Sequence, residues 1–363
     1  MKKNLHLSIP AIGITSFFSI FNTSKRYPIV STRIWFILIG LLAWSFVVNG
    51  QSIVTTDIAS TNLCPGQTLN VSYTINTTTG VFTAGNVFRV QLSNAAGLFP
   101  DNDNSSNIIG SVTSAAAGTI TATIPDNQAA GTGYRVRVVS TNPAANHVNA
   151  SDDDNGNDLT VLGRTISTGN PSPAGPYCPG ASITVNYTVN CDFVSPNTFT
   201  LQLSNAAGSF SSPTNIGSTS ATGNGSVSGT LPETAAGGAG YRVRVVANNP
   251  GITGSQSSAF TILTRTITTV DPTPAGPYCA GDNINVAYAV NCPFISPNTF
   301  TLQLSDRFGN FGSPTNIGSV SATSNGSISG TIPEIRYGTG YQVRVVANKS
   351  NGKRHGLWRS NWC

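Results

Sequence analysis

Hydrophobic and polar residues alternate in short runs along most of this chain. In SITVNYTVN, the apolar residues Ile183, Val185 and Tyr187 alternate with Thr184 and Asn186. A period of two places one set on the core face of a β-strand and the other set in water. Further runs of this kind occur at 199–203, 227–231 and 241–245. Clusters of Gly, Pro and Asn separate the runs, so the pattern predicts an all-β fold.

The runs belong to a repeat that occurs three times. GTGYRVRVV at 131–139 returns as GAGYRVRVV at 238–246 and GTGYQVRVV at 338–346. FRVQLSNAAG at 88–97 returns as FTLQLSNAAG at 199–208 and FTLQLSDRFG at 300–309. The repeat is about a hundred residues long, the size of a domain with its own core. About seven short strands in that length predict an immunoglobulin-like β-sandwich.

We therefore expect three tandem immunoglobulin-like sandwiches, the third of which lacks its last strand. The expected boundaries are 51–163, 164–264 and 265–349, followed by a non-repeat tail at 350–363. Repeat 2 runs from VVANNP into SSAFTIL, whereas repeat 3 runs from VVAN into KSNGKRHGLWRSNWC. Truncation or a frameshift is the preferred explanation of the tail. A basic and aromatic tail that binds a membrane or a polyanion is the alternative.

A Gly-x-Gly-Tyr motif introduces the penultimate strand of each repeat, at Tyr134, Tyr241 and Tyr341. The motif resembles the tyrosine corner of immunoglobulin-type sandwiches, in which the tyrosine hydroxyl bonds to the backbone just upstream. A buried core tyrosine without that bond is the alternative.

Taken together, these motifs resemble a known group of proteins. C-x-G, V-x-Y-x-V, F-x-x-QLS, TIP and GTGYRVRVV are similar to the tandem immunoglobulin-like (fibronectin III-like) repeats of large secreted surface proteins of Bacteroidota-type bacteria. The resemblance covers 52–349, and GTGYRVRVV is its most specific part. It implies export and a repetitive stalk, and it supplies no catalytic residues. Such proteins often end in a sorting domain, which this sequence does not show, so cell attachment is open.

The first fifty residues read as an export signal. Basic residues precede the apolar run from Ile34 to Val48, and small residues before Gln51 would suit a cleavage site. A membrane-spanning helix needs about 20 apolar residues, more than this run offers. Residues 1–50 therefore predict a cleaved signal peptide and a secreted or surface location. A membrane anchor that is retained is the alternative.

Charge excludes one class of partner. Only 9% of the residues are charged, and the net charge of +5 comes from Lys2, Lys3, Lys25, Arg26 and Arg33. The rest of the chain carries equal numbers of basic and acidic residues. A nucleic-acid partner is therefore not expected.

The cysteines predict covalent links between neighbouring repeats. A strand separates Cys178 from Cys191 and spans about 26 Å, whereas a disulfide requires Cα atoms within roughly 7 Å. The two cysteines of one repeat should therefore lie at opposite ends of their sandwich. In a head-to-tail array, the turn before the second strand of one sandwich meets the loop after the second strand of the next. This placement predicts the pairs Cys64–Cys191 and Cys178–Cys292.

The same scheme explains why Thr77 replaces the second cysteine of the first repeat, which has no preceding repeat to bond. It also predicts that Cys279 waits for a further repeat. Cys363 is another potential partner, although a chance cysteine in the tail is the preferred reading. Pairing within repeats, and free or metal-bound thiols, are the alternatives to the scheme.

Two further groups are candidates for binding. Asp152, Asp154 and Asp158 are spaced like the start of a calcium loop, but the distal Glu is missing, and a solvated loop is the plainer interpretation. Alternation predicts an exposed strand face bearing arginines that could bind acidic polysaccharide or simply be solvated. These arginines are Arg135, Arg137, Arg242, Arg244 and Arg344.

We expect no enzyme, because the ingredients of catalysis are dispersed. His6, His147 and His355 lie in the leader, a loop and the tail, and Glu233 and Glu334 are a domain-length apart. Apart from calcium, no cofactor is expected. The leading hypothesis is an exported, non-enzymatic stalk or adhesin segment, whose partners would be extracellular polysaccharide or other surface proteins. A carbohydrate- or matrix-binding module, or an accessory region of a secreted hydrolase, are the alternatives.

Overall fold

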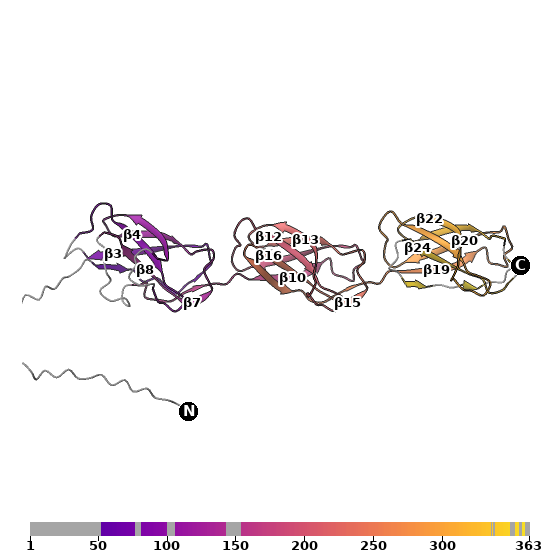
Figure 1. The fold of residues 1–363 in the computed structure, drawn as a ribbon, viewed down its shortest axis with the longest axis horizontal. Coiled ribbons are helices and arrows are strands. Elements are labelled where there is room, and N and C mark those ends of the chain that lie inside the picture. Colours follow the sequence, from indigo (N-terminus) through magenta and orange to yellow (C-terminus); the bar gives the residue numbers. More distant parts are fainter. Residues whose placement is uncertain are drawn as a thin grey trace, which may run out of the picture. The chain divides into compact units, whose positions relative to one another are not determined.

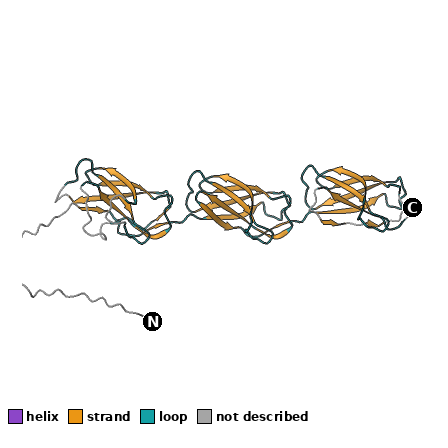
Figure 2. Cartoon of the chain, in the orientation of Figure 1, coloured by secondary structure: helices purple, strands orange, loops and turns teal. Residues whose placement is uncertain are grey.

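The computed structural model describes residues 52–76, 81–99, 106–142, 154–334, 336 and 338–348, together with the backbone of 353–355 and 358–359. Every regular element in these residues is a β-strand (Figures 1 and 2). No helix in the described part of the chain is long and apolar enough to cross a membrane. The signal segment at 1–50 lies outside the described residues.

Three separate hydrophobic cores divide the strands into three β-sandwiches. The strands of the first sandwich form three small sheets, ordered β1-β3-β6, β5-β4-β8 and β2-β9-β7. They are β1 (Ser52–Thr55), β2 (Asn62–Leu63), β3 (Thr68–Asn76), β4 (Val87–Leu92), β5 (Ile108–Thr113), β6 (Gly118–Thr123), β7 (Gly131–Tyr134), β8 (Val136–Ser140) and β9 (Leu159–Val161).

The second sandwich repeats this arrangement with sheets β10-β11-β14, β13-β12-β16-β17 and β15-β18. Its strands are β10 (Ile166–Ser172), β11 (Ser182–Val189), β12 (Thr198–Leu203), β13 (Thr214–Ser220), β14 (Gly225–Thr230), β15 (Gly238–Tyr241), β16 (Val243–Asn248), β17 (Gly251–Gln256) and β18 (Phe260–Ile262). On β11, Ile183, Val185 and Tyr187 are buried, as the alternation predicts.

The third sandwich has two sheets, ordered β23-β20-β19-β25 and β22-β21-β24-β26. Its strands are β19 (Thr266–Thr273), β20 (Asn283–Val290), β21 (Thr299–Leu304), β22 (Thr315–Ser321), β23 (Gly326–Thr331), β24 (Gln342–Ala347), β25 (Lys353–His355) and β26 (Trp358–Arg359).

The tail expected as a non-repeat segment at 350–363 contains two strands. The backbone of β26 pairs with β24, where β17 pairs with β16 in the second sandwich, and β25 runs parallel to β19. Gln342 and Val343 of β24 are therefore paired by the tail. No described strand takes the place of β18, so within the described residues the third sandwich lacks that closing strand.

The tyrosine hydroxyls close a corner in all three sandwiches. The Oη atoms of Tyr134, Tyr241 and Tyr341 donate to backbone carbonyls five residues upstream, at distances of 2.9, 2.8 and 3.0 Å. The glycine before each tyrosine has a steric reason. A Cβ atom on Gly240 would lie 2.5 Å from the carbonyl oxygen of Ala206, closer than a side chain can approach. The Gly-x-Gly-Tyr motif therefore encodes both the bond and the close backbone approach.

Candidate functional site

Each of two disulfides joins one sandwich to the next. Cys64 lies between β2 and β3 and is bonded to Cys191, which follows β11 in the next sandwich, with Cα atoms 5.5 Å apart. Cys178, before β11, is bonded to Cys292, after β20, with Cα atoms 5.6 Å apart. These are the pairs that the strand-length argument predicts.

The prediction for the remaining cysteine of the repeats is wrong. Cys279 is itself disulfide-bonded, and none of the described cysteines is a free thiol. It therefore does not wait for a further repeat in this chain. Cys363, the other partner considered, and Thr77 lie outside the described residues.

An arginine in the first linker binds both of the sandwiches that it connects. The Nη1 and Nη2 atoms of Arg164 donate to the backbone carbonyls of Asp126 and Pro65, at 2.7 and 3.1 Å. Its Nη2 also lies 3.1 Å from Oδ1 of Asp126. On the other side, Nε donates to the carbonyl of Asp192 in the second sandwich, at 2.7 Å. The Arg164 side chain is only 5% exposed, so this guanidinium fills the space between the two sandwiches.

The second linker repeats the device with Arg265. Its Nη1 lies 2.5 Å from Oε2 of Glu233, and its Nη2 donates to the carbonyl of Pro179 at 2.8 Å, both in the second sandwich. The guanidinium carbon lies 5.1 Å from the centre of the Phe294 ring, in the third sandwich. Each junction is therefore a disulfide beside a buried arginine. We call the disulfide, the linker arginine and the residues that bind this arginine a junction.

The sequence itself holds a signal for these arginines. Arg164 and Arg265 occupy the same position in the repeat, directly before Thr-Ile at the first strand. Asp126 and Glu233 also correspond, each following the proline that ends a strand. A cation and an anion that recur at fixed places in successive repeats are candidates for a contact between neighbours.

An open groove of about 610 Å³ lies at the first junction. Its lining mixes polar and apolar groups, and the polar ones are Gln67, Asp126, Arg164, Asn190, Asp192 and Ser195 beside the Cys64–Cys191 bond. Its aromatic residue, Phe193, is buried in the core of the second sandwich. The groove therefore offers hydrogen-bonding groups but no exposed ring on which a sugar could stack.

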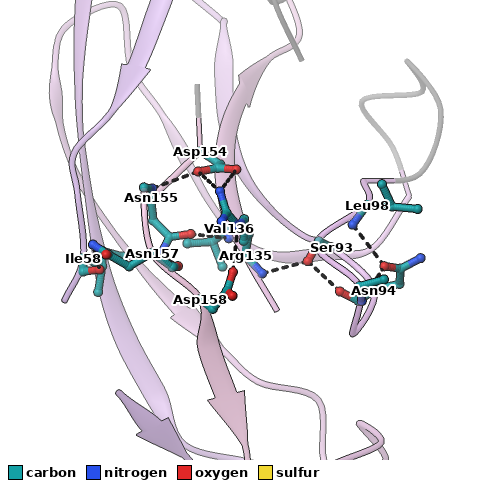
Figure 3. Close-up of polar contacts among 12 residues, drawn as sticks. Ile58, Ser93, Asn94, Leu98, Arg135, Val136, Asp154, Asn155, Asn157 and Asp158 are labelled. Atoms are coloured by element: carbon teal, nitrogen blue, oxygen red, sulfur yellow. Dashed lines mark hydrogen bonds and ion pairs between the residues drawn. The ribbon is translucent and has the colours of Figure 1, made fainter. Parts of the chain in front are cut away.

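A second polar cluster in the first sandwich centres on Arg135 (Figure 3). Its Nη1 lies 3.1 Å from Oδ2 of Asp154, and its Nε lies 2.9 Å from Oδ1 of Asp158. Oδ1 of Asp154 also accepts the backbone N–H of Gly156, and the buried Asn155 accepts the N–H of Val136. Hydrogen bonding to Asp154, followed by that to Asp158, raises the pKa of Arg135. The loop is thus fastened to the sheet by an ion-pair network.

This network bears on the calcium hypothesis. Two of the three candidate ligands, Asp154 and Asp158, already bind Arg135, and Asp152 lies outside the described residues. Among the described residues, no group of three His, Cys, Asp or Glu side chains is placed to hold a metal ion. A calcium site at these aspartates stays a prediction, and it would require the ion to displace Arg135.

The expected exposed arginine face is wrong for Arg137, which is 4% exposed. Its Nε donates to Oε1 of Gln91, and its guanidinium lies over the ring of Phe99. Arg244 and Arg344, both half-buried, make the same pair of contacts with Gln202 and Phe210, and with Gln303 and Phe311. The alternation correctly places these arginines off the core face, but neighbouring side chains cover them.

The other two arginines of that face are also engaged. Arg135 forms the ion-pair network described above, and Nη1 of Arg242 donates to the carbonyl of Ser257 at 2.8 Å. Both are half-buried. The five arginines therefore fasten strands and loops to one another. Binding of polysaccharide by this face stays a prediction, and it has fewer open donors than the sequence suggests.

The chain is only distantly similar to the known proteins with which it was compared. No protein-family model matches it, and no curated protein matches it. Among solved structures, Salmonella alpha-2-macroglobulin reacted with methylamine is 12% identical, with a TM-score of 0.19, over 87% of this chain. A marsupial T cell receptor is 11% identical, with a TM-score of 0.22, and covers 86% of this chain and 100% of its own.

A third likeness is the BSP domain of a biofilm associated protein, 12% identical, with a TM-score of 0.22, over 91% of this chain and 70% of its own. The chain spans only 24% of the alpha-2-macroglobulin. The chain's own strands and cores define it as an array of immunoglobulin-like β-sandwiches. Its function has to be argued from its own residues.

Proposed function

We propose that this chain is an exported, non-enzymatic repeat protein that acts as a stalk or adhesin segment on the cell surface or outside the cell. The observation that carries the proposal is the doubled fastening of each junction, by a disulfide and by a buried arginine. A chain that only linked independent modules would need neither. Two fastenings restrict the hinge between neighbouring sandwiches, and this restriction suits a spacer that holds a binding partner away from a surface.

The cysteines also support export. Disulfides persist in oxidising compartments and are rare in the cytosol. Two bonds between sandwiches, and a fifth cysteine of the repeats that is also oxidised, therefore favour an extracellular address. In this proposal residues 1–50 are the export signal, and the sandwiches occupy 51–163, 164–264 and 265–349. The sequence resemblance to surface proteins of Bacteroidota-type bacteria agrees with this address.

Expression of the full chain from Met1 in a bacterial host tests the export. The expected product begins at Gln51, lies outside the cytoplasm and carries no thiol that reacts with iodoacetamide before reduction. A chain that keeps residues 1–50 inside the cytoplasm, with reactive thiols, would contradict the proposal. A glycan array probed with the exported chain separates a spacer from a carbohydrate-binding module. Reproducible binding of one glycan class would favour the module.

A further inference from the structure

The receiving half of each junction has the same three parts. In the first sandwich they are the Pro65 carbonyl, the acid Asp126 and Gly66, which has a positive φ of 86°. In the second they are the Pro179 carbonyl, Glu233 and Gly180, with φ of 85°. The carbonyl and the acid accept the linker arginine of the next sandwich. We call these three parts the arginine receptor.

The third sandwich carries the same arginine receptor, made of the Ala280 carbonyl, Glu334 and Gly281. Gly281 has a φ of 90°, and its N–H donates to the carbonyl of Ile332 at 2.8 Å. The N–H of Gly180 bonds to Leu231 in the same way, at 3.1 Å. Glu334, like Glu233, lies two residues beyond this acceptor in the sequence. The turn and the acid are therefore held together by the backbone, whether or not an arginine is present.

Burial distinguishes the third receptor from the other two. The difference lies in the carbonyl-bearing residue: Pro65 and Pro179 are buried beneath their junctions, whereas Ala280 is exposed. Gly281 and Glu334 are exposed too, as Gly66 and Asp126 are in the first sandwich. A Cβ atom on Gly180 would lie 3.3 Å from the Ile295 side chain of the following sandwich. At Gly281, no described atom lies within 4 Å of that position. Glu334 has no hydrogen bond or ion pair with any described residue.

We propose that the Ala280–Gly281–Glu334 receptor is a docking surface for a further sandwich of the same repeat type. The partner would present an arginine directly before its first strand, as Arg164 and Arg265 do. A guanidinium fits because its fork of N–H groups can donate to a carbonyl and a carboxylate at once. The first sandwich of a second copy is not that partner, since Gln51 stands in the arginine position. The inference is independent of the proposed stalk, because it concerns one surface whatever the chain binds.

A chain in which residues 248–347 occur twice in tandem tests the proposal. The duplication joins Ala347 to a second Asn248, so the third sandwich gains the counterparts of β17 and β18 and is followed by a second Arg265. The measurement is the rate at which thermolysin cleaves beside the second Leu263, with the disulfides reduced. Glu334→Gln in the first copy should raise that rate about fivefold, because an exposed linker is cut more readily. Arg265→Gln in the second copy should raise it to a similar extent.

Combining the two substitutions should give no further increase, because each removes the same contact. Glu334→Gln in the unduplicated chain is the matched control and should change its cleavage rate less than twofold. The proposal would be overturned if the two substitutions raised the cleavage rate independently, so that their effects multiplied. It would also be overturned if Glu334→Gln did not change the cleavage rate of the duplicated chain. With the disulfides intact, mass spectrometry should find the first Cys279 bonded to the second Cys292. A first Cys279 that stays bonded elsewhere would also count against the proposal.

Discussion

Arg265 and Glu233 form an ion pair across the boundary of the second sandwich, with Nη1 and Oε2 2.5 Å apart. The arginine side chain is 6% exposed, because Phe294 of the third sandwich covers its plane and the Pro179 carbonyl accepts its Nη2. A single side chain thus contacts both neighbours. Desolvation makes such a guanidinium costly unless all its partners are in place. The arginine therefore stabilises only the docked arrangement of the two sandwiches.

Arg265→Ala should weaken the second junction. The substitution removes an ion pair, a backbone bond and a ring contact, but Glu233 is 33% exposed, so water would compensate part of the loss. We expect the free energy of unfolding to fall by about 1–3 kcal/mol, measured by urea denaturation of the reduced chain. Arg265→Lys keeps the positive charge but lacks the planar fork of N–H groups. Its free energy of unfolding should therefore lie between those of the parent and the alanine variant. An alanine variant as stable as the parent would show that the arginine adds nothing.

The tyrosine corner allows a matched pair of substitutions in one sandwich. Tyr241→Phe removes a hydroxyl that bonds to the carbonyl of Ala236, and should cost about 1 kcal/mol. Tyr187→Phe removes a buried hydroxyl that has no hydrogen-bond partner among the described residues, and should be neutral or slightly stabilising. The midpoint temperature for thermal unfolding of the second sandwich should fall by about 4–8 °C for Tyr241→Phe only. Equal shifts of the midpoint temperature for the two variants would mean that the hydrogen bond of the Tyr241 hydroxyl adds no stability of its own.

Asp306 should make the third sandwich sensitive to acid. Its Oδ1 accepts the N–H groups of Asn310 and Phe308, and the bond from Asn310 is the largest cause that lowers the pKa of Asp306 below its ordinary value of 3.8. A lowered pKa in the folded state means that this stabilisation is complete above the unfolded-state pKa. It is lost as the pH falls through the folded-state pKa.

Asp306→Asn is the control for this pH dependence. Asn94 and Asn205 hold the corresponding turns with the same two bonds, so asparagine fits the site without a titrating group. Melting curves of the parent should move to lower temperature below about pH 4, and the variant should lack that component. Identical acid profiles for the two chains would refute the assignment to Asp306.

The loop of the first sandwich should depend on Asp154 rather than on calcium. Asp154→Asn breaks the ion pair with Arg135 at a carboxylate that is 7% exposed, and should lower stability by about 1–2 kcal/mol in the presence of a chelator. Asp158→Asn changes a carboxylate that is 55% exposed, and should cost less than about 0.5 kcal/mol. A loss seen only when calcium is present would favour the calcium hypothesis instead.

Much of the fold could be predicted because it depends on local patterns. Alternation assigned Ile183, Val185 and Tyr187 to the core, and the length of one strand was enough to exclude a bond between Cys178 and Cys191. The burial of Arg137 could not be read in this way. It depends on Gln91 and Phe99, which reach the arginine from another strand and its following loop. Alternation shows which way a side chain points, but not what covers it.

The linker arginines were missed for a related reason. Arg164 looks like an ordinary polar residue between domains, and only its contacts with Asp126 and Asp192 reveal that it lies between two sandwiches. The sequence shows that these residues recur at one position of the repeat, but it does not show that their side chains are buried. The pairing of β25 and β26 was missed because the tail shares no pattern with the earlier repeats.

The most direct test of the account measures motion at the first junction. Spin labels carried by unnatural amino acids at the exposed positions Ala117 and Ser212 would report the spread of distances between two sandwiches, by pulsed electron resonance. The native chain should give one narrow distribution. Reduction should widen it modestly, because Arg164 still binds both sides, and reduction combined with Arg164→Ala should widen it strongly. A broad distribution in the oxidised native chain would contradict the claim that disulfide and arginine together fasten the junction.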